Sequence, residues 1–485
     1  MNNVVNLRRR LASCILLALA WTLAGCERHP RLSTDSEEAE KFYREGLALL
    51  EKFYFVEAKS ALQHAVETDS NFAMAYARLA LLYQRSGNDD SARLYIRRAV
   101  GKSAGASEFE VLFIRMLDHG LHTRHREALS VAESLTTLFP TVGEPYVFLG
   151  DYYEFVGQAD DALRAFEKAV EADPSYAPAV MSLGYAYSKR GKASEAIRTM
   201  QRYIELVPDA ADPRASFADI LLHSGKYAEA LEQYRASLQF KPDYWYSVTR
   251  IGDVYAVLGR LNDAERQYEK AQLATVGGKN SYAQLLAVKG DLQLRRGRYE
   301  DALRYYAEAE RLDSTNLRWA FGRVYALLKL HRIDQAGKEL ATLRDELLRR
   351  NLGPSGAMLG YHLLRARLLQ GQRLFEQALQ ACDSALQFGT ELSRTEVYHL
   401  MAQIYLDAGN HDAALDALDA ALRYNSNNPF VLLTLARVYG AARDTLMTRE
   451  IGNRLLDIWK EADRDFEPLR ELRQILARDG SRPPS

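Results

Sequence analysis

The chain has 485 residues, of which 47% are hydrophobic and 26% are charged, a composition that is ordinary for a soluble globular protein. Its 63 basic and 64 acidic residues almost cancel, so the basic footprint that nucleic-acid binding requires is missing. The three cysteines, Cys14, Cys26 and Cys382, stand in unrelated contexts without a CxxC pair, which argues against a disulfide framework and a zinc ribbon.

Residues 1–25 have the pattern of an export signal. Three consecutive arginines, Arg8 to Arg10, precede an apolar run from Leu11 to Leu23, and small residues follow the run. This run is shorter than the roughly 20 residues that cross a bilayer as a helix. The sequence therefore predicts a signal peptide over 1–25 that is removed from the mature protein.

The last residues of that segment, LAGC at 23–26, are similar to the lipobox of bacterial lipoproteins. In that family the cysteine thiol receives a diacylglyceryl group and cleavage occurs directly before it, so the resemblance implies lipidation at Cys26 and stable anchoring by several acyl chains. Glu27 follows the cysteine where enteric inner-membrane lipoproteins carry Asp, which favours the periplasmic face of the outer membrane. The alternative is a plain signal peptide with a chance cysteine. Residues 26–38 are polar and predict a short flexible tether.

From residue 39 onward the sequence repeats itself with a period of 34 residues. The repeat is clearest in segments 146–174, 180–208 and 248–276, where the glycines Gly150, Gly184 and Gly252 fall at multiples of 34. Apolar residues spaced by three and four predict two amphipathic helices in each unit.

The small and special residues of each unit have physical reasons. Gly150 and Ala162 are expected where the two helices cross closely, because a larger side chain would push them apart. Gly157 stands where the first helix must turn, a position that favours positive φ. Pro174 follows the second helix and stops it.

This pattern resembles the tetratricopeptide repeat (TPR) family, and the resemblance covers nearly all of the mature chain. It implies an all-α, right-handed superhelical solenoid of about twelve helix-turn-helix repeats. We predict repeats one to nine over 39–350, a break at the glycine- and proline-rich stretch 351–358, and repeats ten to twelve over 359–462. A capping helix at 463–478 and a disordered tail at 479–485 complete the prediction, with an insertion at 279–282 before repeat eight.

Few residues suggest chemistry. His119, His122 and His125 have a spacing that could bind a metal, but Gly120 and the alignment place them across a turn between helices, which favours a solvated turn. Cys382 occupies an apolar position and is expected to be buried. No catalytic motif stands outside the repeats, so we expect no enzyme and no cofactor; a metal enzyme built on the histidines is the weakest alternative.

The concave face is the expected binding surface. In the family that this sequence resembles, the ninth residue of each repeat faces the groove, and here the groove candidates are Asp151, Asp219, Asp253, Asp291, Tyr185 and Met181. Such an acidic line beside apolar residues suits a peptide with basic and apolar side chains. The alternative is that each aspartate caps or solvates its own helix. Val147 with Asp151 replaces the Lys and Asn of the family's carboxylate clamp, so that clamp is not expected.

The export signal and the repeat pattern together predict a non-catalytic lipoprotein scaffold. It is expected to bind proteins or peptides in its groove and the membrane through its lipidated N-terminus. By resemblance, such proteins assemble or position envelope machines for pili, secretion, polysaccharide export or outer-membrane biogenesis. An adaptor that presents substrates to a periplasmic protease or peptidoglycan hydrolase is the alternative, and a cytoplasmic regulatory array would require the signal to be false.

Overall fold

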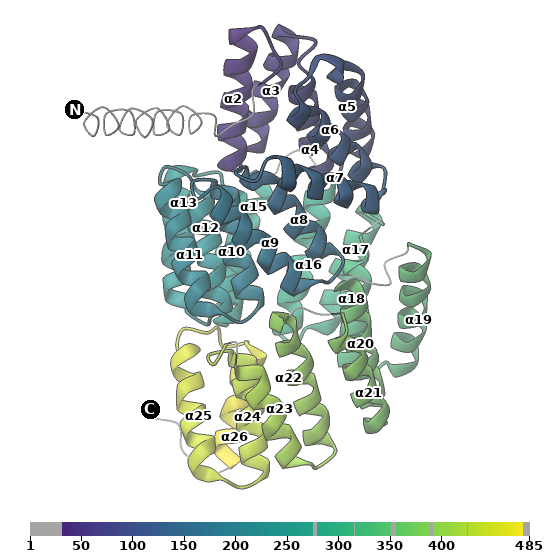
Figure 1. The fold of residues 1–485 in the computed structure, drawn as a ribbon. Helices are drawn as coiled ribbons and strands as arrows, with labels where there is room; N and C mark the ends of the chain where they lie inside the picture. Colours follow the sequence, from purple (N-terminus) through teal and green to yellow (C-terminus); the bar gives the residue numbers. More distant parts are fainter. Residues whose placement is uncertain are drawn as a thin grey trace, which may run out of the picture. The chain divides into compact units, whose positions relative to one another are not determined.

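The computed structural model describes residues 32–274, 279–314, 316–350, 356–388, 391–423 and 425–478. Within these ranges the chain forms 25 α-helices, α2 to α26, one short 3-10 helix and no strand (Figure 1). Twelve helix pairs follow one another, and the single helix α26 comes last. The predicted all-α repeat fold is confirmed.

The chain divides into two compact units, Met1–Leu183 and Gly184–Ser485, with the boundary inside α10 (Ala177–Lys189). The first unit contains α2 (Glu37–Glu51), α3 (Phe55–Thr68), α4 (Ala73–Arg85), α5 (Asp89–Lys102), α6 (Glu108–Leu121), α7 (His125–Leu138), α8 (Gly143–Phe155) and α9 (Ala159–Ala172).

The second unit contains the second helix of repeat five, repeats six to twelve and the last helix, α26. Its helices are α11 (Ala193–Leu206), α12 (Asp212–His223), α13 (Tyr227–Phe240), α14 (Trp245–Val257), α15 (Leu261–Ala274), α16 (Lys279–Arg295), α17 (Tyr299–Leu312), α18 (Arg318–Lys329), α19 (Ile333–Arg349), α20 (Gly356–Gly371), α21 (Phe375–Leu386), α22 (Glu391–Asp407), α23 (His411–Leu422), α24 (Pro429–Ala441), α25 (Thr445–Ile458) and α26 (Glu467–Arg478). Because α16 begins at Lys279, the stretch expected as an insertion at 279–282 forms its first turn.

Each of the twelve repeats turns between its two helices at a residue with positive φ, between 56° and 80°. Seven of these residues are glycines, including Gly157 at 79°, which confirms the predicted role of that glycine. The other five are Phe53, Thr123, His331, Arg373 and Arg443. The turn hydrogen bond is the same with and without glycine: the Gln158 amide donates to the Tyr153 carbonyl at 2.8 Å, and the Leu374 amide to the Leu369 carbonyl at 2.9 Å.

The helices of a pair cross closely at the glycine of the first helix. A Cβ added to Gly252 would lie 2.5 Å from Cε1 of Tyr268, closer than real side-chain atoms approach. Gly150 faces Phe166 in the same way, and Phe166 is buried. The predicted close crossing at this position is therefore present in the structure.

Part of the expected tether is attached to the first unit. Ser33 bonds through its hydroxyl to the carboxylate of Glu110, and the Ser107 amide donates to Ser33 Oγ at 2.8 Å. Thr34 Oγ1 donates to Asp69 Oδ2 at 2.6 Å. Residues 33 and 34 are therefore held by repeats one and three and are not free.

Several predicted segments lie outside the described residues: the signal peptide at 1–25, Cys26 and the following residues up to 31, most of the break at 351–358, and the tail at 479–485. In the range of the predicted capping helix, α26 buries Leu469, Leu472 and Leu476 against the last repeat.

Candidate functional site

In the second unit, the C-terminal repeats contact the turns of repeats six to eight, which lie about 200 residues earlier in the sequence. Trp459 is 1% exposed and donates from Nε1 to the carbonyl oxygen of Val257 at 3.1 Å. The Asp463 amide donates to the carbonyl oxygen of Gly259 at 2.9 Å, and the Asp463 carboxylate accepts from the Asn262 amide at 2.7 Å. We call the contact of residues 425–430 and 459–467 with the turns of repeats six to eight the seam.

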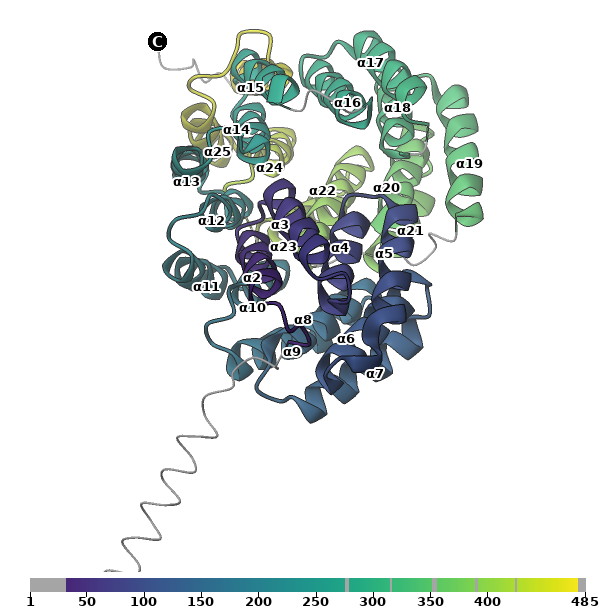
Figure 2. The same ribbon diagram turned by 90° about the horizontal axis from the view of Figure 1, so that it is seen from above.

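Apolar packing lies inside the seam and ion pairs surround it. Phe466 is fully buried, with its ring centroid 5.2 Å from that of Trp459. Arg260 pairs with Glu461 at 2.5 Å, and Arg298 with Asp465 at 3.2 Å. The Trp459–Val257 hydrogen bond joins the residue after α25 to the last residue of α14, two helices that lie near each other in the view of Figure 2. A seam of buried aromatic rings brings two distant parts of the second unit together.

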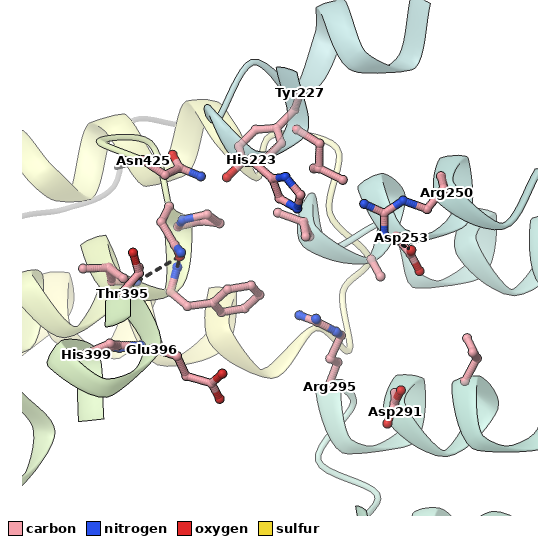
Figure 3. A pocket seen from close by; sticks show the side chains of 18 of the residues that line it. His223, Tyr227, Arg250, Asp253, Asp291, Arg295, Thr395, Glu396, His399 and Asn425 are labelled. Atoms are coloured by element: carbon pink, nitrogen blue, oxygen red, sulfur yellow. Dashed lines mark hydrogen bonds and ion pairs between the residues drawn. The ribbon is translucent and has the colours of Figure 1, made fainter. Parts of the chain in front are cut away.

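The seam helps to enclose a cavity of about 530 Å³, which we call the second-unit cavity (Figure 3). One wall comes from α12, α14, α16 and α18, and the opposite wall from α22 and the start of α24. Its charged and polar lining includes His223, Arg250, Asp253, Asp291, Arg295, Arg318, Glu396 and His399. Two of the predicted groove residues, Asp253 and Asp291, thus line this cavity.

The aspartates of repeats six to eight each accept a hydrogen bond from a tyrosine of the second helix of the same repeat. Tyr268 donates to Asp253 at 2.8 Å, and Tyr306 to Asp291 at 2.5 Å. Burial, together with the neighbouring Asp253, raises the pKa of Tyr268 well above its ordinary value, so the hydroxyl remains a proton donor. Both contacts join residues 15 apart in the sequence.

Asp219 is the most enclosed of these aspartates, with 3% exposure. It accepts hydrogen bonds from Tyr234, Tyr185 and Tyr246, and Arg250 Nε donates to it at 2.9 Å. The predicted groove residues Asp219 and Tyr185 are therefore engaged with each other inside the protein, as buried charge requires.

Two arginines, Arg250 of repeat seven and Arg318 of repeat nine, complete the network. Arg250 Nη1 lies 2.7 Å from Asp253 Oδ2, and Arg318 Nη2 lies 2.9 Å from Asp291 Oδ2. Burial lowers the pKa of His399 to about 3 and also lowers that of His223, so both rings are neutral at pH 7. In repeats six to eight, arginines therefore balance the charge of the aspartates that the sequence predicted as an acidic line.

The first unit contains a separate cavity of about 580 Å³, the first-unit cavity, whose walls are largely apolar. Leu47, Met74, Phe148 and the predicted groove residues Met181 and Asp151 are among the residues that line it. Asp151 is exposed, and repeat four has Phe166 where repeats six to eight have the tyrosine.

A buried ion pair crosses the floor of the first-unit cavity. Arg78 is 6% exposed and binds Glu144 through two contacts, Nη1–Oε1 at 2.5 Å and Nη2–Oε2 at 2.8 Å. Its guanidinium also lies 4.5 Å from the ring centroid of Phe113. Burial, then Glu144 and Asp173, raise the pKa of Glu51. Five carboxyl side chains and three arginines line this cavity, so its lining is acidic on balance.

The histidines of repeat three are spread over the turn between α6 and α7. His119 lies in the last turn of α6, His122 follows it with Nδ1 3.2 Å from Asp118 Oδ1, and the His125 ring lies 5.3 Å from that of Phe155. Across the described ranges, no group of three or more His, Cys, Asp or Glu side chains is placed to hold a metal ion. Cys382 is buried, and burial raises the pKa of its thiol to about 12.

Sequence reasoning missed the tyrosine partners, Arg295, and the seam. The Asp–Tyr spacing of 15 in repeats six, seven and eight is a readable signal for the first of these. Nothing in the repeat pattern indicates the seam, because it joins residues about 200 apart.

None of the described helices is long and apolar enough to cross a membrane. Stacked helix pairs define a helical-repeat protein. Tetratricopeptide-repeat models match residues 73–101, 156–216, 245–315, 288–346 and 395–428. The chain belongs to the tetratricopeptide-repeat family, whose domains generally bind proteins or peptides.

Solved structures of similar fold are distant. A tetratricopeptide repeat protein from Parabacteroides merdae is 14% identical, covering 60% of this chain and 100% of its own, with a TM-score of 0.34. A thermophilic TPR protein in Thermus thermophilus is 22% identical, covering 38% and 99%, with a TM-score of 0.34. The APC/C hetero-tetramer Cut9–Hcn1 is 12% identical, covering 90% and 96%, with a TM-score of 0.36. No curated protein matches the chain.

Proposed function

We propose that this protein is a non-catalytic scaffold lipoprotein of the bacterial envelope that binds proteins or peptides in its concave cavities and helps to assemble or position an envelope machine. The observation that carries the proposal is that each unit of this helical-repeat chain contains a cavity, of about 580 Å³ in the first and about 530 Å³ in the second. Cavities of this size hold several side chains of a bound segment.

The envelope location rests on the sequence. Arginines, an apolar run and LAGC at 23–26 support export and lipidation at Cys26, with the lipid on the periplasmic face of the outer membrane. The substitution Cys26→Ser should release the protein from membranes and abolish labelling by a palmitate analogue. Membrane retention of that variant, with no labelling of the wild type, would contradict the proposed anchor.

The first-unit cavity suits a segment with apolar and basic side chains, because Asp151 and Glu51 line apolar walls there. Charge reversal by Asp151→Lys should weaken capture of the partner about tenfold, since one favourable charge contact becomes repulsive. Asp160→Lys, which reverses an exposed charge of the neighbouring helix α9 outside the cavity lining, is the matched control.

Crosslinking in native membranes followed by purification tests the function itself. Recovery of channel, pilus or export components supports the scaffold. Recovery of a soluble protease or peptidoglycan hydrolase, with that enzyme's substrates left uncleaved when the protein is deleted, would instead support an adaptor. Recovery of no specific protein would refute both.

A further inference from the structure

We propose that the second-unit cavity binds a carboxylate of a protein ligand through the guanidinium of Arg295. The inference rests on the proposed protein-binding function and names the chemistry that one cavity recognises. It differs from the sequence expectation, which predicted basic ligands along the whole groove.

Arg295 is the one arginine of this cavity that forms no hydrogen bond or ion pair with the rest of the described chain. Arg250 lies between Asp219 and Asp253, and Arg318 pairs with Asp291. The contact that Arg295 does make is with the ring of Phe430, whose centroid lies 4.9 Å from its guanidinium carbon.

That ring contact fixes the side chain without using its donors. A guanidinium stacks on an aromatic ring through its face, while its N–H groups point outward in the plane and match the two oxygens of a carboxylate. Figure 3 shows the Arg295 guanidinium directed into the space between the two walls. Arg295 is therefore held in place with its donors available.

The other side chains of the second-unit cavity leave the positive charge of Arg295 without a negative partner. His223 and His399 are neutral, and both aspartates of the lining already have a tyrosine and an arginine partner. The hydroxyl of Thr395, on the opposite wall, is buried and has no hydrogen-bond partner among the described residues. A ligand oxygen could satisfy it.

Glu396 limits the number of negative charges that the ligand can carry in this cavity. It lines the same cavity from α22, is exposed, and would repel a second carboxylate. The favoured ligand is therefore a segment with a single carboxylate flanked by neutral or basic residues. Its carboxylate can belong to an acidic side chain or to a chain end.

Three unlabelled nine-residue peptides of alanine, leucine and lysine, acetylated at the N-terminus, test the proposal by isothermal titration calorimetry on the full mature chain. The first has a central glutamate and an amidated end, the second has glutamine in place of glutamate, and the third has glutamine and a free carboxyl end. We expect the glutamate peptide to bind about tenfold tighter than the amidated glutamine peptide, the factor of a charge-assisted hydrogen bond. Arg295→Gln should remove that difference.

Arg304→Gln is the matched control, because Arg304 is an exposed arginine of the same repeat that pairs with Asp301 away from the cavity. It should leave the difference unchanged. Tight binding of the free-end peptide alone, lost in Arg295→Gln, would support the same site with a terminal carboxylate as ligand. Equal binding of all three peptides, binding of none, or a preference that survives Arg295→Gln would overturn the inference. If membrane crosslinking still recovers a specific partner, only this inference fails and the proposed function stands.

Discussion

Gly259 offers a direct test of the seam, because its turn is where the C-terminal segment docks. Its φ is +74°, and an added Cβ would lie 2.6 Å from Cδ1 of Phe466 and 2.7 Å from Cβ of Ala462. Gly409 occupies the same turn position in repeat eleven, with φ of +80° and nothing within 4 Å of an added Cβ. Replacing each glycine with alanine therefore separates backbone strain from steric conflict at the seam.

The expected costs differ. Positive φ costs alanine about 1–2 kcal/mol at either position. Overpacking against Phe466 and Ala462 adds about 1–3 kcal/mol for Gly259→Ala alone. If that addition falls on the seam, its opening should become about five- to hundredfold more frequent.

Hydrogen exchange of residues 459–467 is the assay, because the Asp463 amide is bonded to the carbonyl of Gly259. Exchange there should accelerate in Gly259→Ala and stay near the wild-type rate in Gly409→Ala, whose strain lies in a different turn. Equal exchange of this segment in both variants would refute the reasoning, since the seam would then not depend on the space that Gly259 leaves.

Three further predictions concern stability. Burial raises the pKa of Asp212 to about 6, above its ordinary 3.8, so its contribution to folding falls by up to about 3 kcal/mol as pH rises from 4 to 7. Asp212→Asn should therefore gain stability over the wild type across that range in urea unfolding, and a constant difference between pH 4 and 7 would contradict this. Glu144→Ala leaves Arg78 buried without its carboxylate and should cost about 3–5 kcal/mol within the first unit, seen as faster hydrogen exchange in α4 and α8; unchanged exchange would count against it. Arg373→Gly relieves a positive φ of 62° and should raise stability by about 0.5–1 kcal/mol in thermal unfolding, whereas a lower midpoint would show that the arginine side chain outweighs the strain.

The repeat pattern predicted which residues line the groove but not the partners of their side chains. The pattern placed Asp151, Asp219, Asp253 and Asp291 at equivalent positions, and four of the expected groove residues do line cavities: Asp151, Met181, Asp253 and Asp291. Their electrostatic environments differ, because the residue 15 positions later is Phe166 in repeat four and tyrosine in repeats six to eight. Aspartates at equivalent repeat positions therefore lie in different electrostatic environments.

By itself the sequence determined the number of repeats, the helix pairs, the turn positions and the close crossings, because each depends on residues within one repeat or its neighbour. Only the tertiary structure decided which residues of repeats eleven and twelve meet the turns of repeats six to eight, and that Arg295 has no carboxylate partner. The reason is geometric. Each repeat adds a small rotation, and these rotations bring segments 200 residues apart into contact only when summed over several repeats.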